Sequence, residues 1–204
     1  MDFSIKTEGL PYSERKMRMV FPVGLCYIGV EIFSALVYVM AERLEFLYFA
    51  RGGNLIKIVI ITKNKKDFLD LLLLADQEYM IDKYLDRGTL FALYDDDLKS
   101  ICVVTDEGNG NYEIQNLATY EQFQNKGYGT RLVKHVFDYY KDKALVMYVG
   151  TGDGPLAIPF YERCGFSFSH RIKNYMLEQY DIPIFEAGIQ LKDKVYLKRN
   201  LRSE

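Results

Sequence analysis

The segment from residue 111 to residue 143 constrains the fold more than any other part of the chain. NYEIQNLAT (111 to 119) alternates polar and apolar residues like a β-strand, and YGTRLVKHVFDYYKDK (128 to 143) has the apolar spacing of a helix. The turn between them, QNKGYG (124 to 129), contains two glycines and no carboxylate. A helix start exposes unpaired N–H groups and the positive end of the helix dipole. The turn is therefore predicted to hold an anion, above all a phosphate.

The chain after Gly53 predicts alternating strands and helices. Strands are predicted at 57 to 63, 89 to 96, 99 to 107, 144 to 150, 165 to 171 and 194 to 199, and helical structure at 65 to 88 and 155 to 164. Turn residues at 95 to 97 and 108 to 111 indicate that the strands between 89 and 119 run antiparallel in succession. The connection from 174 to 193 is too long and too apolar for a simple solvated turn.

Composition excludes several classes of function. The net charge is −2 and no basic stripe is present, which argues against a nucleic-acid partner. The three cysteines, Cys26, Cys102 and Cys164, stand far apart without CxxC spacing, which favours a reducing compartment over a disulfide framework or a structural zinc site. The two histidines are too few for a histidine-rich metal site. We therefore expect a cytoplasmic protein without a bound metal.

The first 55 residues differ from the rest, and we place the start of the folded domain, 56 to 204, after them. Residues 19 to 40 are long and apolar enough to span a bilayer, but Glu31 near the middle disfavours insertion by roughly 2.5 to 3.5 kcal/mol. Three interpretations stay open: a membrane-associated segment, a helical extension packed on the domain, or a stretch ahead of the natural start. The last rests on 51 to 55, RGGNL, which a ribosome-binding site followed by a TTG start codon could encode.

Two motifs, in the order in which they follow one another along the chain, resemble those of one known superfamily. QNKGYG fits the Q/R-x-x-G-x-G/A pattern of the GNAT superfamily of N-acetyltransferases, and GPLAIPFYERCGF (154 to 166) is similar to its alanine, tyrosine and glycine-aromatic segment. From about Ile56 onward the chain resembles small bacterial members. The resemblance implies an α+β fold (mixed α/β): a twisted mixed sheet of six to seven strands, flanked by about four helices and splayed between its fourth and fifth strands.

The resemblance also implies acetyl-CoA as the cosubstrate. The backbone of Leu117, Ala118 and Thr119 would pair with the pantetheine arm of the cosubstrate. Its pyrophosphate would rest on the N–H groups of Gln124, Asn125, Lys126, Gly127, Tyr128, Gly129 and Thr130. Gly154 departs from the pattern, because many relatives have an asparagine there that touches the cofactor arm.

The expected reaction is direct transfer of an acetyl group to a primary amine of a small molecule or peptide, in a ternary complex. Tyr161 matches the family's tyrosine near the thioester sulfur and is expected to protonate the departing thiolate. Glu113 precedes Gln124 by eleven positions, the spacing of the glutamate in histone-acetylating members, and is the expected base. The plainer alternatives are a solvent-facing glutamate and a core tyrosine. The C-terminal strand is expected to contribute to a homodimer surface or an acceptor wall.

Two other functional interpretations compare with this one as follows. GTGDG (150 to 154) has the outline of a dinucleotide-binding turn, but no parallel strand ending in an acidic residue follows it, which argues against a nicotinamide enzyme. A protein of this fold can also bind acyl-CoA without catalysis, as a binding or sensor module, and the sequence leaves that open. The resemblance implies that the early helices, which carry Asp70, Asp76, Glu78 and Tyr79, border the acceptor pocket. Charge on an amphipathic helix usually marks its solvent-exposed face, so the sequence names none of these residues as a ligand.

Overall fold

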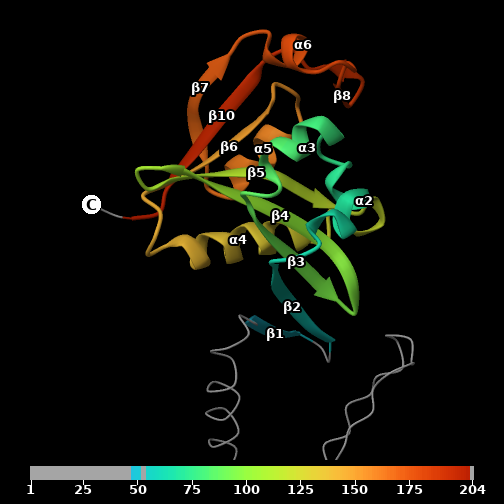
Figure 1. Ribbon diagram of the computed structural model, residues 1–204, viewed down its shortest axis with the longest axis vertical. Helices are drawn as coiled ribbons and strands as arrows, with labels where there is room; N and C mark the ends of the chain where they lie inside the picture. The colour runs from blue at the N-terminus through green and yellow to red at the C-terminus, as the bar shows by residue number, and fades with distance from the viewer. Residues whose placement is uncertain (1–46, 52–53, 203–204) are drawn as a thin grey trace, which may run out of the picture. The chain divides into compact units, whose positions relative to one another are not determined.

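An eight-stranded mixed sheet organises the part of the chain that the computed structural model describes, residues 47–51 and 54–202. Its spatial order is β1-β2-β3-β4-β5-β6-β10-β7, so β10 inserts between β6 and β7. The strands are β1 (Leu47–Arg51), β2 (Asn54–Ile61), β3 (Thr89–Asp95), β4 (Asp97–Gly108), β5 (Asn111–Thr119), β6 (Val146–Gly152), β7 (Ser167–Ile172) and β10 (Lys194–Asn200). In Figure 1, β1 and β2 form one end of the sheet, and β7 and β10 lie toward the other. Counted from β2, the sheet has seven strands, and the predicted fold class is confirmed.

Helices cover both faces of this sheet. They are the 3-10 helices η2 (Lys65–Phe68) and η3 (Glu121–Phe123), and the α-helices α2 (Leu69–Leu72), α3 (Glu78–Tyr84), α4 (Tyr128–Tyr140), α5 (Ala157–Arg163) and α6 (Tyr175–Gln179). Leu90 and Ala92 of β3 belong to the apolar cluster of α2 and α3, whereas Phe91 and Leu93 belong to the cluster of α4 and α5. The middle of β3 is continuously apolar because both of its faces are buried.

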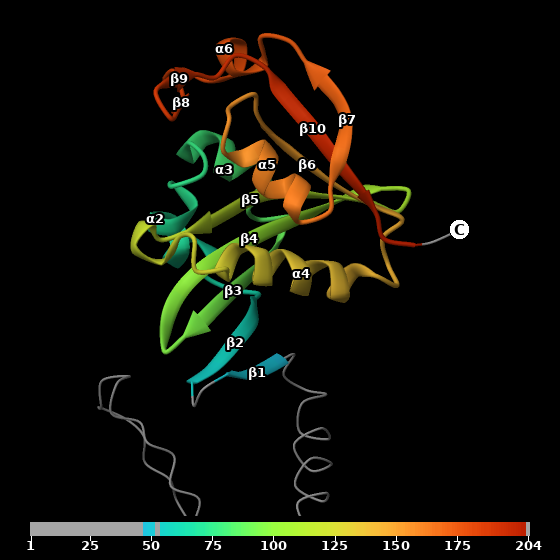
Figure 2. The same cartoon turned by 180° about the vertical axis from the view of Figure 1, so that it is seen from behind.

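Helix α4 supplies more buried side chains than any other described helix to the cluster of α4 and α5. Its buried residues recur at helical spacing along one stripe, which faces the sheet: Leu132, Val133, Val136, Phe137 and Tyr140. Figure 2 shows α4 running along the sheet beside β3 and β4. This packing holds the first turn of α4, and with it the glycine turn, next to the end of β5.

The sheet opens between β5 and β6, the only parallel pair among the described strands. Pairing runs from Asn111 opposite Val146 to Ile114 opposite Val149 and then stops, although β5 continues to Thr119. The register of β5 against β4 also shifts between Ile114 and Asn116, as at a β-bulge. Beyond Ile114, β5 therefore makes no backbone pairs with β6. The splay between these two strands, expected from the resemblance, is present.

The helical segment predicted from 65 to 88 is broken, which corrects the expectation of continuous helix. Helix α2 ends at Leu72 and α3 begins at Glu78. Between them the N–H of Gln77 donates to Oδ1 of Asp76 at 2.9 Å, and Gln77 has an extended backbone (φ −85°, ψ 149°). The helical pattern continues through this break, so periodicity alone did not reveal it.

The connection from 174 to 193 forms structure of its own, as its apolar character indicated. It contains α6 and a small hairpin of β8 (Phe185–Glu186) and β9 (Ile189–Gln190). The Tyr79 hydroxyl donates to the carbonyl of Gln179 at 2.7 Å, and Nε2 of Gln77 donates to the carbonyl of Ile182 at 3.0 Å. These bonds hold the connection over the α2–α3 break.

The apolar stretch from 19 to 40 lies outside the described residues, so the interpretations of the first 55 residues stay predictions. Within the described ranges, no helix has both the length and the apolar character that a membrane span requires. The same ranges contain no cluster of three or more His, Cys, Asp or Glu side chains suited to a metal ion.

Candidate active site

The glycine turn has backbone angles suited to binding an anion. Asn125 and Gly127 both have left-handed backbones, with φ of 58° and 85°, a geometry that directs turn N–H groups into an anion-binding concavity. The first backbone bond of α4 runs from the N–H of Arg131 to the carbonyl of Gly127 at 3.0 Å. No side chain caps the helix start. The N–H groups of residues 128 to 130 therefore have no partner within the helix.

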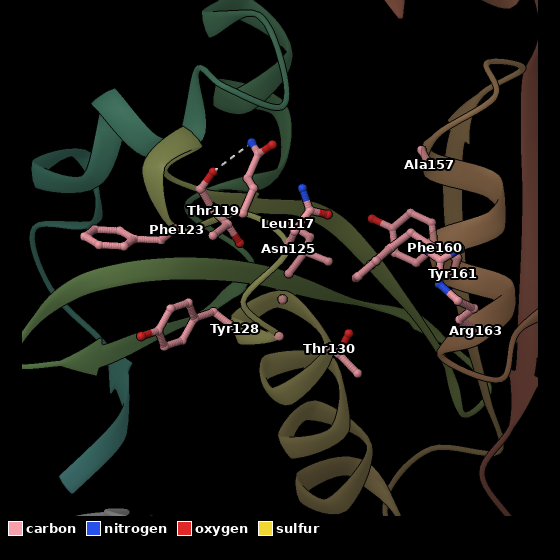
Figure 3. A pocket seen from close by; sticks show the side chains of 13 residues that line it. Leu117, Thr119, Phe123, Asn125, Tyr128, Thr130, Ala157, Phe160, Tyr161 and Arg163 are labelled. Carbon is pink, nitrogen blue, oxygen red and sulfur yellow. Dashed lines mark hydrogen bonds between the residues drawn. The ribbon is translucent and has the colours of Figure 1, made fainter. Parts of the chain in front are cut away.

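A cavity of about 420 Å³ lies against this turn, and we call it the turn cavity. Eight of the residues predicted to bind the cosubstrate line it: Leu117, Thr119, Gln124, Asn125, Gly127, Tyr128, Gly129 and Thr130. Helix α5 forms the opposite wall in Figure 3, with Ala157, Phe160, Tyr161 and Arg163. None of the thirteen lining residues is acidic, and Arg163 is the one cation among them. This electrostatic environment suits an anionic ligand.

Two predicted residues do not line the turn cavity. Ala118 is buried in the α2–α3 cluster, so only its backbone is available to the edge of β5. Nζ of Lys126 instead lies 5.3 Å from the ring centroid of Phe123. The positive charge on the cavity wall comes from Arg163, which sequence reasoning missed although it follows Tyr161 by two positions in the second motif.

Gln124 and Gly129 each contribute to the shape of the turn. Nε2 of Gln124 donates to the carbonyl of Thr119 at 3.2 Å, which ties the turn to the end of β5 (Figure 3). A Cβ at Gly129 would lie 3.4 Å from Cζ of Phe160 and 3.6 Å from Oγ1 of Thr119. Any larger side chain at this position would therefore enter the space between β5 and α5.

Tyr161 lies where two cavities meet. Its side chain is buried in the α4–α5 cluster, edge-on to Phe160 and Phe166 at centroid distances of 5.1 and 5.7 Å. It also lines both the turn cavity and a second cavity. Burial raises the pKa of the Tyr161 hydroxyl, so this group stays protonated at neutral pH. The core and functional interpretations of Tyr161 are thus compatible.

The second cavity measures about 600 Å³, and we call it the tyrosine cavity because Tyr84, Tyr161, Tyr175 and Tyr180 line it. Its walls come from β5, β6, the α2–α3 break and the connection between β7 and β10. Leu117, Gln124, Ala157 and Tyr161 line both cavities. Two ligands, one in each cavity, would therefore meet at this junction.

Glu113 lies behind the wall of the tyrosine cavity rather than in it. Its Oε1 is 3.7 Å from Nζ of Lys194, and only 12% of the Glu113 side chain is exposed. Burial raises the pKa of Glu113, and the positive charge of Lys194 offsets part of this rise. Lys194 does line the cavity, with its Nζ 5.0 Å from the ring centroid of Tyr175.

Sequence reasoning missed a polar group beside the α2–α3 break. Oδ1 of Asp76 accepts the Tyr180 hydroxyl at 3.0 Å, and the hydroxyl of Tyr84 also interacts with this carboxyl. Nδ2 of Asn116 donates to the Tyr84 oxygen at 2.9 Å and to the carbonyl of Leu72 at 3.0 Å. Burial raises the pKa of Asp76. The local sequence carries no clear signal for this group, because its members meet only through tertiary packing.

Gly154 departs from the family pattern for a steric reason. A Cβ at this position would lie 2.1 Å from Oε2 of Glu186, which accepts the N–H of Leu156 at 2.7 Å. Asp153, one candidate to replace the lost asparagine contact, accepts the N–H of Lys192 at 2.9 Å. An asparagine at 154 would require the side chains of Glu186 and Leu191 to move.

Comparisons with known proteins agree with this geometry. The acetyltransferase (GNAT) family model matches residues 60–166. The chain is 33% identical over 150 residues to the uncharacterized N-acetyltransferase YvbK of Bacillus subtilis (strain 168), which covers 72% of this chain and 97% of that protein.

Solved structures are similar as well. A GNAT family acetyltransferase from Elizabethkingia anophelis, crystallised with acetyl-CoA, matches with a TM-score of 0.67 and 33% identity over 71% of this chain and 97% of that one. A Bacillus subtilis acetyltransferase in complex with CoA matches with a TM-score of 0.66 and 32% identity, over 71% and 98% of the two chains. By sequence and by fold, the chain belongs to the GNAT family of acetyltransferases.

Proposed function

We propose that this enzyme transfers an acetyl group from acetyl-CoA to a primary amine by direct attack within a ternary complex, using a domain that extends from about residue 56 to residue 204. The observation that carries the proposal is the junction of the turn cavity and the tyrosine cavity at Leu117 and Tyr161. A reaction between two bound substrates needs their reacting atoms within about 3 to 3.5 Å, and a shared wall allows this.

The turn cavity has the features that acetyl-CoA needs. The N–H groups from Asn125 to Thr130, together with Arg163, would hold the pyrophosphate, whereas the predicted N–H of Gln124 already donates to the carbonyl of Glu121 at 3.1 Å. The unpaired edge of β5 from Leu117 to Thr119 would pair with the pantetheine arm. Similar structures from Elizabethkingia anophelis and Bacillus subtilis hold acetyl-CoA and CoA respectively. Bound acetyl-CoA supplies an acetyl group activated as a thioester.

Three groups of the chain would carry the chemistry. The protonated hydroxyl of Tyr161 donates a proton to the departing sulfur, and a backbone N–H on the free edge of β5 polarises the thioester carbonyl. Glu113 accepts the proton from the amine. Because Lys194 rather than Glu113 lines the cavity, this transfer passes through an intervening water.

The described cysteines favour direct attack over an acetyl-enzyme. Cys102 and Cys164 are buried, and burial raises the pKa of both thiols. A thiol that stays protonated is a poor nucleophile. Neither residue is therefore suited to carry the acetyl group between the two substrates.

Initial-rate kinetics with both substrates varied test this function. We expect double-reciprocal lines that intersect, as a ternary complex requires, and CoA release that depends on the amine. Parallel lines would indicate a covalent intermediate. Binding of acetyl-CoA without CoA release in the presence of a panel of primary amines would indicate a binding module instead.

A further inference from the structure

The tyrosine cavity contains a carboxylate that lacks a cationic partner. Asp76 lines this cavity and accepts hydrogen bonds from the Tyr180 hydroxyl and the N–H of Gln77. Among the described residues, no Lys, Arg or His nitrogen lies within 4 Å of its oxygens. The hydrogen bonds fix the direction of the carboxylate, and the positive charge of Lys194 acts on it only from beyond 4 Å.

The cations on the same wall are engaged elsewhere. Lys194 pairs with Glu113 at 3.7 Å, and Arg87 pairs with Glu107 at 2.8 Å. Nζ of Lys83 contacts Sδ of Met80 at 3.1 Å. A further carboxylate of the cavity, Glu186, is occupied by the N–H of Leu156. Lys83, Arg87 and Lys194 thus bring more positive than negative charge to the lining as a whole, and the negative charge that no ion pair meets is local to Asp76.

Two tyrosine hydroxyls contact this carboxylate, and the ring of one of them packs against two further tyrosines. The ring of Tyr180 meets that of Tyr79 edge-on at 6.4 Å and that of Tyr175 at 6.5 Å, while the Tyr84 hydroxyl interacts with Asp76 itself. Aromatic faces and a carboxylate together attract an ammonium ion more strongly than either group alone. Tyr79 and Tyr175 already have the ammonium groups of Lys83 and Lys194 at 5.3 and 5.0 Å from their ring centroids, so Asp76 and the ring of Tyr180 are the groups left for an alkylammonium ligand.

The position of Asp76 indicates which ammonium group it binds. A carboxylate beside the reacting nitrogen would stabilise its protonated form and oppose attack on the thioester. Such a partner suits a positive charge that the acceptor keeps throughout the reaction. Asp76 is connected through Tyr84 to Asn116, the residue next to Leu117 at the junction of the cavities. An acceptor that reaches both places therefore carries its second ammonium group at the end of a methylene chain.

Building on the proposed function, we propose that Asp76, with Tyr84 and Tyr180, binds a second ammonium group of the acceptor, which is therefore an aliphatic diamine or polyamine. Asp76 determines specificity in this role and does not take part in the transfer itself. The reacting amine attacks the acetyl carbonyl as the C–N bond forms and the C–S bond breaks. Its proton goes to Glu113, and the sulfur receives a proton from Tyr161.

Steady-state kinetics with two amines of equal length test this assignment. We expect the wild-type enzyme to have a KM for 1,5-diaminopentane at least about tenfold below that for n-pentylamine, because only the diamine keeps a charge for Asp76. In Asp76→Asn the KM for the diamine rises about tenfold or more, kcat changes less than about threefold, and the values for pentylamine stay as in the wild type. Asp70→Asn is the matched control: Asp70 also accepts a tyrosine hydroxyl, that of Tyr120, but lies outside both cavities.

Several results would overturn the proposal. Equal KM values for the two amines in the wild type would remove the need for a second charge. A loss of kcat with both amines in Asp76→Asn would make Asp76 the base instead. Should Asp76→Asn fail to fold, Tyr180→Phe keeps the charge but removes one of its hydrogen bonds, and a KM rise confined to the diamine is expected there too.

Binding measurements separate this proposal from the proposed function. Calorimetric titration of 1,5-diaminopentane into the CoA-bound wild type is expected to give binding that Asp76→Asn weakens about tenfold. A chain that binds CoA and acetylates pentylamine, yet has no preference for the diamine, retains the proposed function and loses the Asp76 assignment. A chain that binds CoA but not the diamine also loses the assignment. A folded chain that does not bind CoA loses both.

Discussion

Two glycines allow the anion-binding role of the turn to be separated from its backbone geometry. Gly127 and Gly108 have nearly the same left-handed φ, 85° and 82°, and a Cβ added at either would have no atom within 4 Å. Alanine in this conformation costs roughly 1 to 2 kcal/mol. Gly127 lines the turn cavity, whereas Gly108 lies at the β4–β5 hairpin. Gly108→Ala is therefore a control with equal strain and no change at the cavity.

The two substitutions are expected to differ in binding but not in stability. A strain of that size lowers the melting temperature of either variant by about 2 to 8 °C in a domain of this length. In Gly127→Ala the added methyl group also keeps a phosphate oxygen from the turn N–H groups. Loss of one hydrogen bond to a charged group costs about 1.5 to 3 kcal/mol, so the Kd for CoA rises about 10- to 150-fold.

Calorimetric titration of CoA and thermal melts of the three proteins measure both effects. We expect similar melting temperatures for the two variants and weakened CoA binding in Gly127→Ala alone. Wild-type affinity in Gly127→Ala would refute the reasoning, because the turn would then be only a steric device. Equal weakening in both variants would refute it as well, since strain rather than contact would explain the loss.

Three further outcomes are expected. Tyr161→Phe lowers kcat by about 10²- to 10⁴-fold and leaves the Kd for CoA unchanged, as rapid-mixing and titration experiments can measure, because only the proton donor is lost; an unchanged kcat would exclude Tyr161 as the acid. Burial raises the pKa of Glu113 above its ordinary value of 4.5, so kcat/KM rises with pH as this base deprotonates, and the rise disappears in Glu113→Gln; a rise that persists would assign the base elsewhere. Lys65 donates to three backbone carbonyls at the end of α3 and after it, at 2.9, 2.9 and 2.5 Å, so Lys65→Met lowers the unfolding free energy by about 1.5 to 3 kcal/mol in urea titrations. Lys66→Met, which breaks only the exposed pair with Asp82, has little effect, and equal losses in the two variants would contradict the role of Lys65.

Local patterns in the sequence determined much of the fold. Alternation over 111 to 119 predicted β5 with its observed ends, and helical spacing from 128 located α4, because these periods reflect one buried face of each element. The glycine turn could be recognised because glycine allows left-handed backbone angles and a helix start leaves its first N–H groups unpaired. Most of the residues that line the turn cavity lie within this continuous stretch, so their proximity required no knowledge of distant contacts.

Tertiary structure decided the features that depend on distant segments. The helical period continues through 73 to 77, yet Asp76 lies in the break between two helices and contacts Tyr180, more than a hundred residues away. Arg163 rather than Lys126 supplies charge to the turn cavity because α5 packs opposite β5. Glu113 pairs with Lys194 only because β10 inserts beside β6. Periodicity indicates which face of an element is buried but not which other element buries it. The tyrosine cavity is lined by elements that are distant in sequence, so the sequence alone did not reveal it.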